Sequence, residues 1–158
     1  MSVRSKWLMR WLAHVTSKLL NFSNPFDLLE DQSSPYFRLK RGYEADYQNL
    51  NDLTPIFDDE VCSVYELPAE AWARRTSGVF GNDLANLSPS KAHAVLTLNP
   101  NGEDYTVSVR APLTNRLGAD EVCSQFPTGG GRKAAAGINA LQQSEKDCFI
   151  RKLHRFYR

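Results

Sequence analysis

Cysteine and histidine are scarce in this sequence of 158 residues, which holds three of each. The cysteines are odd in number and none forms a Cys-x-x-Cys pair, so neither a disulfide framework nor a zinc site is predicted. This usage is typical of a reducing compartment, and we expect a cytoplasmic protein. The histidines lack metal-ligand spacing, no Asp-His-His triplet occurs, and no serine has a nucleophile-elbow context. We therefore predict no metal centre and no catalytic residue.

Long apolar runs are absent too. No segment reaches the ~18 apolar residues of a membrane-spanning helix, and the N-terminus lacks the apolar core and cleavage site of a secretory signal. Charge of either sign is not in excess, because 19 Lys and Arg face 18 Asp and Glu. A molecule that attracts nucleic acid by its overall charge is thereby excluded, so any anion-binding surface must be local.

The chain has an ordinary globular composition, with 42% hydrophobic residues, and the length of one domain with an extension. We predict a helical linker or extension over residues 1–59 and a domain over residues 60–158. Residues 3–20 have the pattern of a basic amphipathic helix that carries Trp7 and Trp11 on its apolar face. Such a helix can lie on a membrane surface, act as a targeting peptide, or pack on another domain or subunit. Packing is the commonest case and is the reading we favour.

Residues 21–59 are irregular in pattern, whereas strands and helices alternate after residue 60. Hydrophobic periodicity predicts strands over 61–67, 92–98, 104–110 and 135–141. It predicts helices over 71–87, with a break near Gly78 as an option, over 118–126, and over 145–156 with Ser144 as N-cap. Asn99–Gly102 is a hairpin turn signal. The expected fold is α+β: a small mixed β-sheet flanked by helices, with an N-terminal helical extension.

Four of the nine glycines lie between residues 129 and 137. Gly129, Gly130 and Gly131 remove every side chain from one predicted loop, so a ligand can approach its backbone closely. Arg132 and Lys133 follow with two positive charges. The pattern fits a cradle for a phosphate or carboxylate, and it fits equally a tight turn whose cations lie in solvent.

Ser108 and Arg110 lie on the polar face of the strand predicted over residues 104–110. If the glycine loop lies beside that strand, Arg110 and Arg132 converge on one anion, for which the planar guanidinium fork is well suited. The alternative is that Arg110 pairs with an acid such as Asp104 or Asp120.

Ser77 and Gly78 fall near the start or the middle of the helix predicted over residues 71–87. A helix N-terminus at this point would add N–H donors to an anion site. The alternative reading is a kink, or a glycine required by packing.

Three segments, in this order, resemble the DHH-associated domain of the DHH phosphoesterase superfamily (RecJ-like and oligoribonuclease-like proteins). Residues 76–85 resemble the first helix of that domain, and residues 105–110 resemble its strand that ends in Ser-x-Arg. Gly129-Gly130-Gly131 with Ala135-Ala136-Gly137 resembles its C-terminal signature. The family usually has a histidine where this sequence has Arg132, so the role of that position stays open. The resemblance covers about residues 60–141.

The resemblance implies a substrate-binding half without the domain that carries the Asp-His-His motif and manganese. The expected ligand is a short single-stranded nucleic acid or a phosphorylated nucleotide. The residues expected to bind it are Ser77, Gly78, Ser108, Arg110, Gly129, Gly130, Gly131, Arg132 and Lys133. We expect no cofactor in this chain, manganese only in the missing catalytic domain, and no hydrolysis by the chain alone.

The resemblance to one half of the family proteins fits a fragment, or a chain that begins inside a longer ancestral protein. Expected partners are a catalytic DHH domain, or a second copy bound through the N-terminal helix. Two other functions remain open. One is a regulatory or interaction module that docks through the N-terminal amphipathic helix, and the other is a transferase whose glycine loop holds a nucleotide cofactor.

Overall fold

The computed structural model describes residues 13–20 and 22–158. The chain divides into two compact units, residues 1–48 and residues 49–158. Within the described residues, no helix combines the length and the apolar character needed to cross a membrane. All three cysteines are free thiols.

The first unit is helical. Residues 13–19 form a helix, followed by the 3-10 helix η1 (Pro25–Leu29) and by α2 (Pro35–Gln48). The part of the predicted N-terminal helix that holds Trp7 and Trp11 lies outside the described residues. The irregular structure expected over residues 21–59 is wrong for α2. No residue of α2 is buried, so the helix is not stabilised by burial of an apolar face. The helix depends instead on a proline at its start and on residues of good helix propensity.

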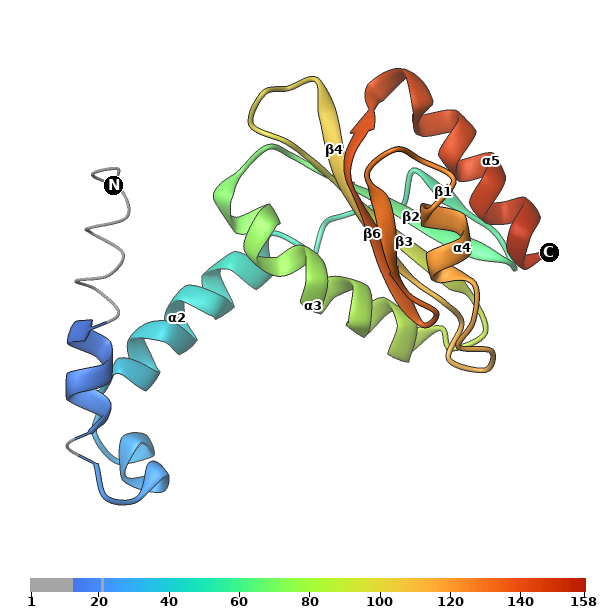
Figure 1. Ribbon diagram of the computed structural model, residues 1–158. Helices are drawn as coiled ribbons and strands as arrows, with labels where there is room; N and C mark the ends of the chain where they lie inside the picture. Colours follow the sequence, from blue (N-terminus) through green and yellow to red (C-terminus); the bar gives the residue numbers. More distant parts are fainter. Residues whose placement is uncertain (1–12, 21) are drawn as a thin grey trace. The chain divides into compact units, whose positions relative to one another are not determined.

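The second unit is built on one six-stranded sheet with the order β1-β2-β3-β4-β6-β5 (Figure 1). Only β2 and β3 are parallel, and the other neighbours are antiparallel. The strands are β1 (Phe57–Asp58), β2 (Cys62–Leu67), β3 (Ala92–Leu98), β4 (Asp104–Arg110), β5 (Gly129–Arg132) and β6 (Ala135–Gln142). The predicted α+β class and all four predicted strands are confirmed.

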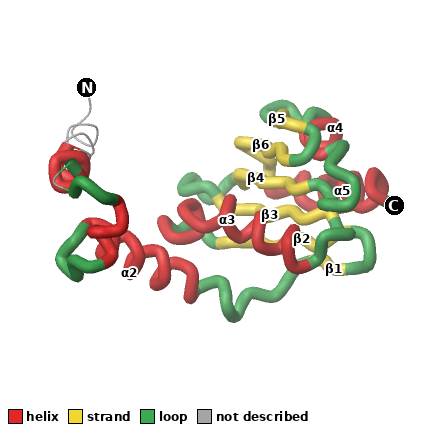
Figure 2. Tube along the Cα trace, turned by 90° about the horizontal axis from the view of Figure 1, so that it is seen from below, coloured by secondary structure: helices red, strands yellow, loops and turns green. Residues whose placement is uncertain are grey.

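Helices cover both faces of this sheet, as Figure 2 shows edge-on. On one face lies α3 (Ala71–Leu87), which connects the parallel strands β2 and β3 and buries Ala73, Thr76, Phe80 and Leu84. The helix is continuous, so the optional break at Gly78 is wrong. The hydroxyl of Thr76 donates to the Trp72 carbonyl at 2.9 Å, which satisfies it inside the core.

The opposite face is covered by α4 (Ala119–Cys123) and α5 (Lys146–Tyr157). Val122, Phe149 and Leu153 of these helices are fully buried and join the main hydrophobic core. The predicted N-cap at Ser144 is wrong. The chain leaves β6 through the 3-10 turn η2 (Gln143–Glu145), and the side chain at the N-cap position, Glu145, makes no capping hydrogen bond.

The glycine stretch is not a loop, which corrects the prediction. Residues 129–132 form the edge strand β5, which pairs with β6 through a two-residue turn at residues 133 and 134. Glycine has a low propensity for strands, so contacts with the rest of the fold make this segment a strand. A Cβ on Gly129 would lie 1.8 Å from the Cys123 carbonyl oxygen of α4, so only glycine allows α4 to approach this closely.

Candidate anion-binding site

Sheet register places both predicted arginines in one row. Arg110 of β4 pairs with Ala135 of β6, and Ala135 pairs with Arg132 of β5. Residues opposite one another in a sheet point to the same face, and two strand spacings separate Arg110 from Arg132 by ~10 Å between Cα atoms. Ala135 between them is small. The two guanidinium groups can therefore reach one ligand on this face.

Arg110 is held rigidly by α3 and by its own strand. Its Nε donates to Asn82 Oδ1 at 2.7 Å, and its Nη2 donates to the Gly78 carbonyl at 3.2 Å. Its Nη1 donates to Ser108 Oγ at 2.8 Å and to the Val109 carbonyl at 3.2 Å. All four acceptors are neutral, so the positive charge of Arg110 is positioned by them without being neutralised.

The acid pairing considered for Arg110 is not observed. Asp104 accepts hydrogen bonds from Asn99 and Asn101 in the β3–β4 turn, and Asp120 lies in α4 on the other face of the sheet. Burial, followed by the positive charge of Arg132, lowers the pKa of Arg110 from its usual value. Arginine still stays protonated at neutral pH, so this point of the surface has a positive potential that favours an anion.

Different physical reasons account for the four glycines in and beside β5. A side chain on Gly129 would collide with α4. Gly131 has a φ of +147°, and a Cβ on it would lie 2.5 Å from the Ala136 Cα. A Cβ on Gly137 would lie 2.6 Å from the Val107 carbonyl oxygen. Gly130 alone among them has no atom within 4 Å of that position. Packing explains three of these glycines, and Gly130 is left as open backbone.

Gly130 lies on the same face as the two arginines. It pairs with Gly137, which pairs with Ser108 of β4. Next to the row that holds the two arginines, Gly130, Gly137 and Ser108 therefore form a second row. Its two glycines have no side chain, and Ser108 ends it with a hydroxyl. A flat ligand or a phosphate can approach the backbone along this row without meeting a side chain.

A groove of about 370 Å³ opens next to Arg110. Its walls come from the second half of α3, the segment after β4 and the β5–β6 turn, and they include Asn82, Asn86, Arg116 and Ala135. The sequence reasoning missed the two asparagines and Arg116. Asn82 and Asn86 lie four and eight residues after Gly78, so they share its helix face. Arg116 had no signal in the sequence.

The structure brings Ser108, Arg110, Gly130 and Arg132 together on one face, with Lys133 exposed in the adjoining turn. It does not place a helix N-terminus there, because α3 begins at Ala71, and Ser77 and Gly78 lie in its interior. Gly78 contributes its carbonyl to Arg110 rather than a free N–H. Gly129 and Gly131 shape the strand through packing.

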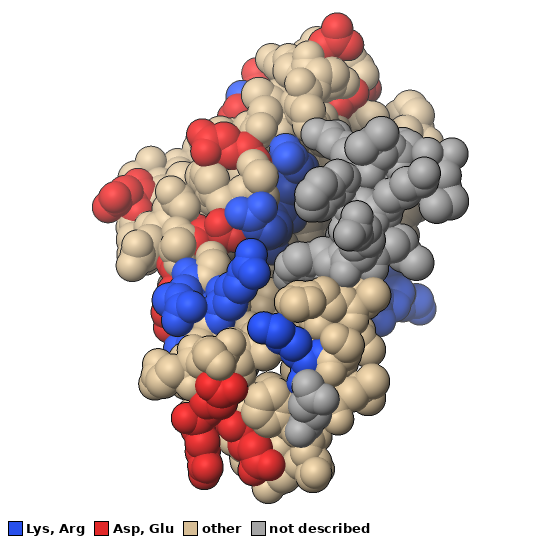
Figure 3. Space-filling view, turned by 90° about the vertical axis from the view of Figure 1, so that its left-hand side faces the viewer, with Lys and Arg blue, Asp and Glu red and all other residues tan. Residues whose placement is uncertain are grey.

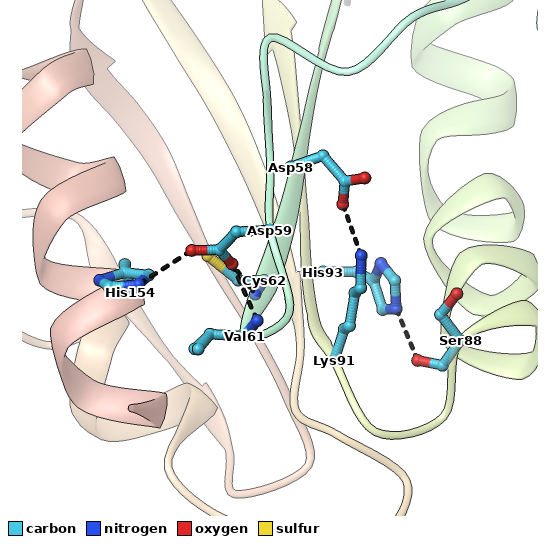
Figure 4. A network of polar contacts seen from close by, with 8 residues as sticks. All are labelled: Asp58, Asp59, Val61, Cys62, Ser88, Lys91, His93 and His154. Carbon is cyan, nitrogen blue, oxygen red and sulfur yellow. Dashed lines mark hydrogen bonds and ion pairs between the residues drawn. The ribbon is translucent and has the colours of Figure 1, made fainter.

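A second polar cluster lies where β1, β2 and β3 meet α5 (Figure 4). Asp59 accepts the backbone N–H groups of Val61 and Cys62 at 2.8 and 2.9 Å and lies 2.9 Å from His154 Nε2. Lys91 pairs with Asp58 at 2.8 Å. These groups satisfy one another, so we interpret the cluster as a structural clamp between the sheet and α5.

No group of three or more His, Cys, Asp and Glu side chains could hold a metal ion within residues 13–20 and 22–158.

No protein-family model and no curated protein match this sequence. Its structure is similar to an exopolyphosphatase-related protein from Bacteroides fragilis, with a TM-score of 0.55 at 14% identity over 73% of this chain. It is also similar to PggH, a pGpG-specific phosphodiesterase from Vibrio cholerae (TM-score 0.54, 13% identity, 81% of this chain). A third similar structure is the exonuclease RecJ bound to manganese (TM-score 0.53, 19% identity, 77% of this chain).

These structures are DHH-family proteins. The chain spans 35%, 44% and 30% of their respective lengths. The resemblance drawn from the three sequence segments is thus confirmed at the level of fold: the chain has the fold of a part of DHH-family proteins.

Proposed function

We propose that this chain binds a phosphorylated ligand, a nucleotide or a short single strand of nucleic acid, on the face that carries Arg110, Arg132 and Gly130. The observation that carries the proposal is the state of Arg110, a half-buried cation fixed by neutral acceptors beside a second cation. Fixing a charge before the ligand arrives lowers the cost of binding.

The groove at Arg110 and the sheet face beside it suggest how a ligand would be held. Arg110 and Arg132 would contact a phosphate through charge-assisted hydrogen bonds, and the bare row at Gly130 and Gly137 would let a base or sugar lie against the backbone. Asn82 and Asn86 add amide groups that can recognise a polar edge. Two of the similar structures are named for acting on such molecules, one as a pGpG-specific phosphodiesterase and one as an exonuclease.

We propose further that the chain is the substrate-binding half of a phosphoesterase and does not hydrolyse its ligand alone. This part rests on the fold, on the share of the similar structures that the chain spans, and on the resemblance of its three segments. Purified protein incubated with a short oligonucleotide and Mn²⁺ should release no mononucleotide. Release that a chelator abolishes would overturn this part, and the binding proposal would stand independently of it.

The binding proposal is tested by titrating a 5′-phosphorylated pentanucleotide, followed by fluorescence anisotropy, against wild type and variants. A charge-assisted hydrogen bond contributes about 1.5–3 kcal/mol, so Arg132→Ala should weaken binding about ten- to a hundredfold. Gly130→Val should abolish binding by covering the backbone. Arg155→Ala is the matched control, because Arg155 is an exposed arginine on α5 across the sheet. Equal affinities for Arg132→Ala and Arg155→Ala would contradict the proposal.

A second candidate function is self-association through the first unit. One observation supports it. Tyr36, Leu39 and Tyr43 are exposed along α2, at a spacing that places them on one helical face. If this face binds a second copy, wild type should sediment as a dimer at high concentration and Leu39→Glu as a monomer. A wild type that stays monomeric would remove this candidate.

A further inference from the structure

A second group of cations lies in the first unit. A pocket of about 180 Å³ opens between the helix of residues 13–19 and the start of α2. Its lining includes His14, Lys18, Arg38 and Arg41 with the polar Gln32 and Ser33. None of its described lining residues is acidic.

The spacing of these residues explains why they meet. Lys18 follows His14 by four residues, and Arg41 follows Arg38 by three, so each pair shares one face of its helix. Both faces line the same pocket. Figure 3 shows Lys and Arg side chains lying next to one another on the surface.

The positive charges in this pocket are only partly compensated. Asp31 lies next to Lys18 at a neighbouring hollow. Hydrogen bonds from Ser33, with a smaller contribution from the charge of Lys18, lower the Asp31 pKa. For Arg38 and Arg41, the structure gives no hydrogen bond or ion pair with any described residue, and the first turn of α2 holds no acid. Like charges facing one pocket repel, so the arrangement costs free energy unless an anion lies between them.

The pocket has the size for one phosphate group. Its volume of about 180 Å³ leaves room for a phosphate together with water around it. Two arginines can grip such a group with their forked N–H donors, and Lys18 adds a point charge. The amide of Gln32, which also lines the pocket, adds a neutral donor for the remaining oxygens.

We propose that this pocket of the first unit binds a phosphate group, with Arg38 and Arg41 as its principal donors. The site is separate in its residues from the face that carries Arg110 and Arg132. The shared chemistry is a phosphate that arrives either as a soluble phosphate or as the headgroup of a lipid.

The test uses the full chain with Arg132→Ala as background, so that the other anion site contributes least. Inorganic phosphate is titrated by isothermal calorimetry at low salt. Arg38→Ala and Arg41→Ala should each weaken binding about ten- to a hundredfold, and Arg38→Lys should recover part of the loss. Lys40→Gln is the matched control, because Lys40 lies on the same helix and pairs with Glu44 at 3.9 Å.

A parallel arm sediments the same proteins with vesicles that contain phosphatidic acid in phosphatidylcholine, and with pure phosphatidylcholine vesicles. Binding of inorganic phosphate that depends on Arg38 identifies a soluble phosphate as the source. Binding to phosphatidic acid alone, with the same dependence on Arg38, identifies a lipid headgroup. Absence of both, or binding that Arg38→Ala and Lys40→Gln reduce equally, would overturn the proposal. Circular dichroism checks that each variant keeps its helices.

Discussion

Replacing Arg110 by alanine, and comparing the result with Arg132→Ala, separates the effect of each arginine on folding from its effect on ligand binding. Arg110 joins β4 to α3 through hydrogen bonds to Asn82 and to the Gly78 carbonyl, and it also binds Ser108. Arg132 is exposed and sits on the edge strand. We therefore expect Arg110→Ala to weaken both folding and ligand binding, and Arg132→Ala to weaken ligand binding only.

The size of the expected destabilisation follows from the hydrogen bonds that Arg110→Ala removes. Hydrogen bonds to a charged group contribute about 1.5–3 kcal/mol each when measured singly. We do not add them here, because the arginine is only half-buried and lies beside an open groove, where solvent can replace part of what is lost. We expect a loss of about 1–3 kcal/mol in the free energy of unfolding. For a unit of this size, that corresponds to a decrease of about 4–12 °C in Tm.

The assay pairs thermal unfolding, followed by circular dichroism, with the pentanucleotide titration. Arg110→Ala should show the lower Tm and weakened binding. Arg132→Ala should keep a Tm within about 2 °C of wild type, and Arg155→Ala should match wild type in both. If Arg110→Ala unfolds at the wild-type temperature, the hydrogen bonds to α3 do not hold the guanidinium in solution, and the argument from a preorganised charge fails.

Two further predictions concern single residues of the sheet. Gly129→Ala should lower the free energy of unfolding by about 1–3 kcal/mol through overpacking against the Cys123 carbonyl, whereas Gly130→Ala should change it by less than about 0.5 kcal/mol; equal urea midpoints would contradict this. Burial lowers the pKa of His93 from 6.5, although its bond to the Ser88 carbonyl opposes the shift. An unfolded histidine takes up a proton below about pH 6.5, while folded His93 does so only at lower pH. The urea midpoint should therefore fall as pH drops below about 6.5, and less so in His93→Gln; identical pH profiles would refute the role of His93.

Much of the sheet could be predicted because its signals are local. Alternating apolar residues define β4, and the turn at Asn99–Gly102 fixes its pairing with β3. The last helix was predicted to within one residue at each end, but its N-cap was not. Ser144 has the right chemistry for a cap, yet the path of the chain out of β6 places it inside a 3-10 turn.

The parts that escaped prediction depend on contacts far apart in the sequence. Residues 129–132 are a strand because β6 pairs with them and α4 packs on one face of them. The propensity of glycine does not suggest a strand here. The convergence of Arg110 and Arg132 was predicted only on condition that the glycine loop lies beside the strand of Arg110. In the structure the glycines form β5, and β6 lies between β5 and β4. The contact between Arg110 and Asn82 joins residues 28 positions apart and was not foreseen.

The most direct test of the central claim maps the ligand on the folded protein. In a ¹⁵N-labelled chain, added pentanucleotide should shift the backbone amides of Gly130 and Arg132 and the Nε–H resonance of Arg110 more than any signal of α5. The shifts should diminish as salt rises, because phosphate contacts release counterions. If the ligand shifts residues of α5 and leaves Gly130 and Arg110 unchanged, this face of the sheet is not the binding site.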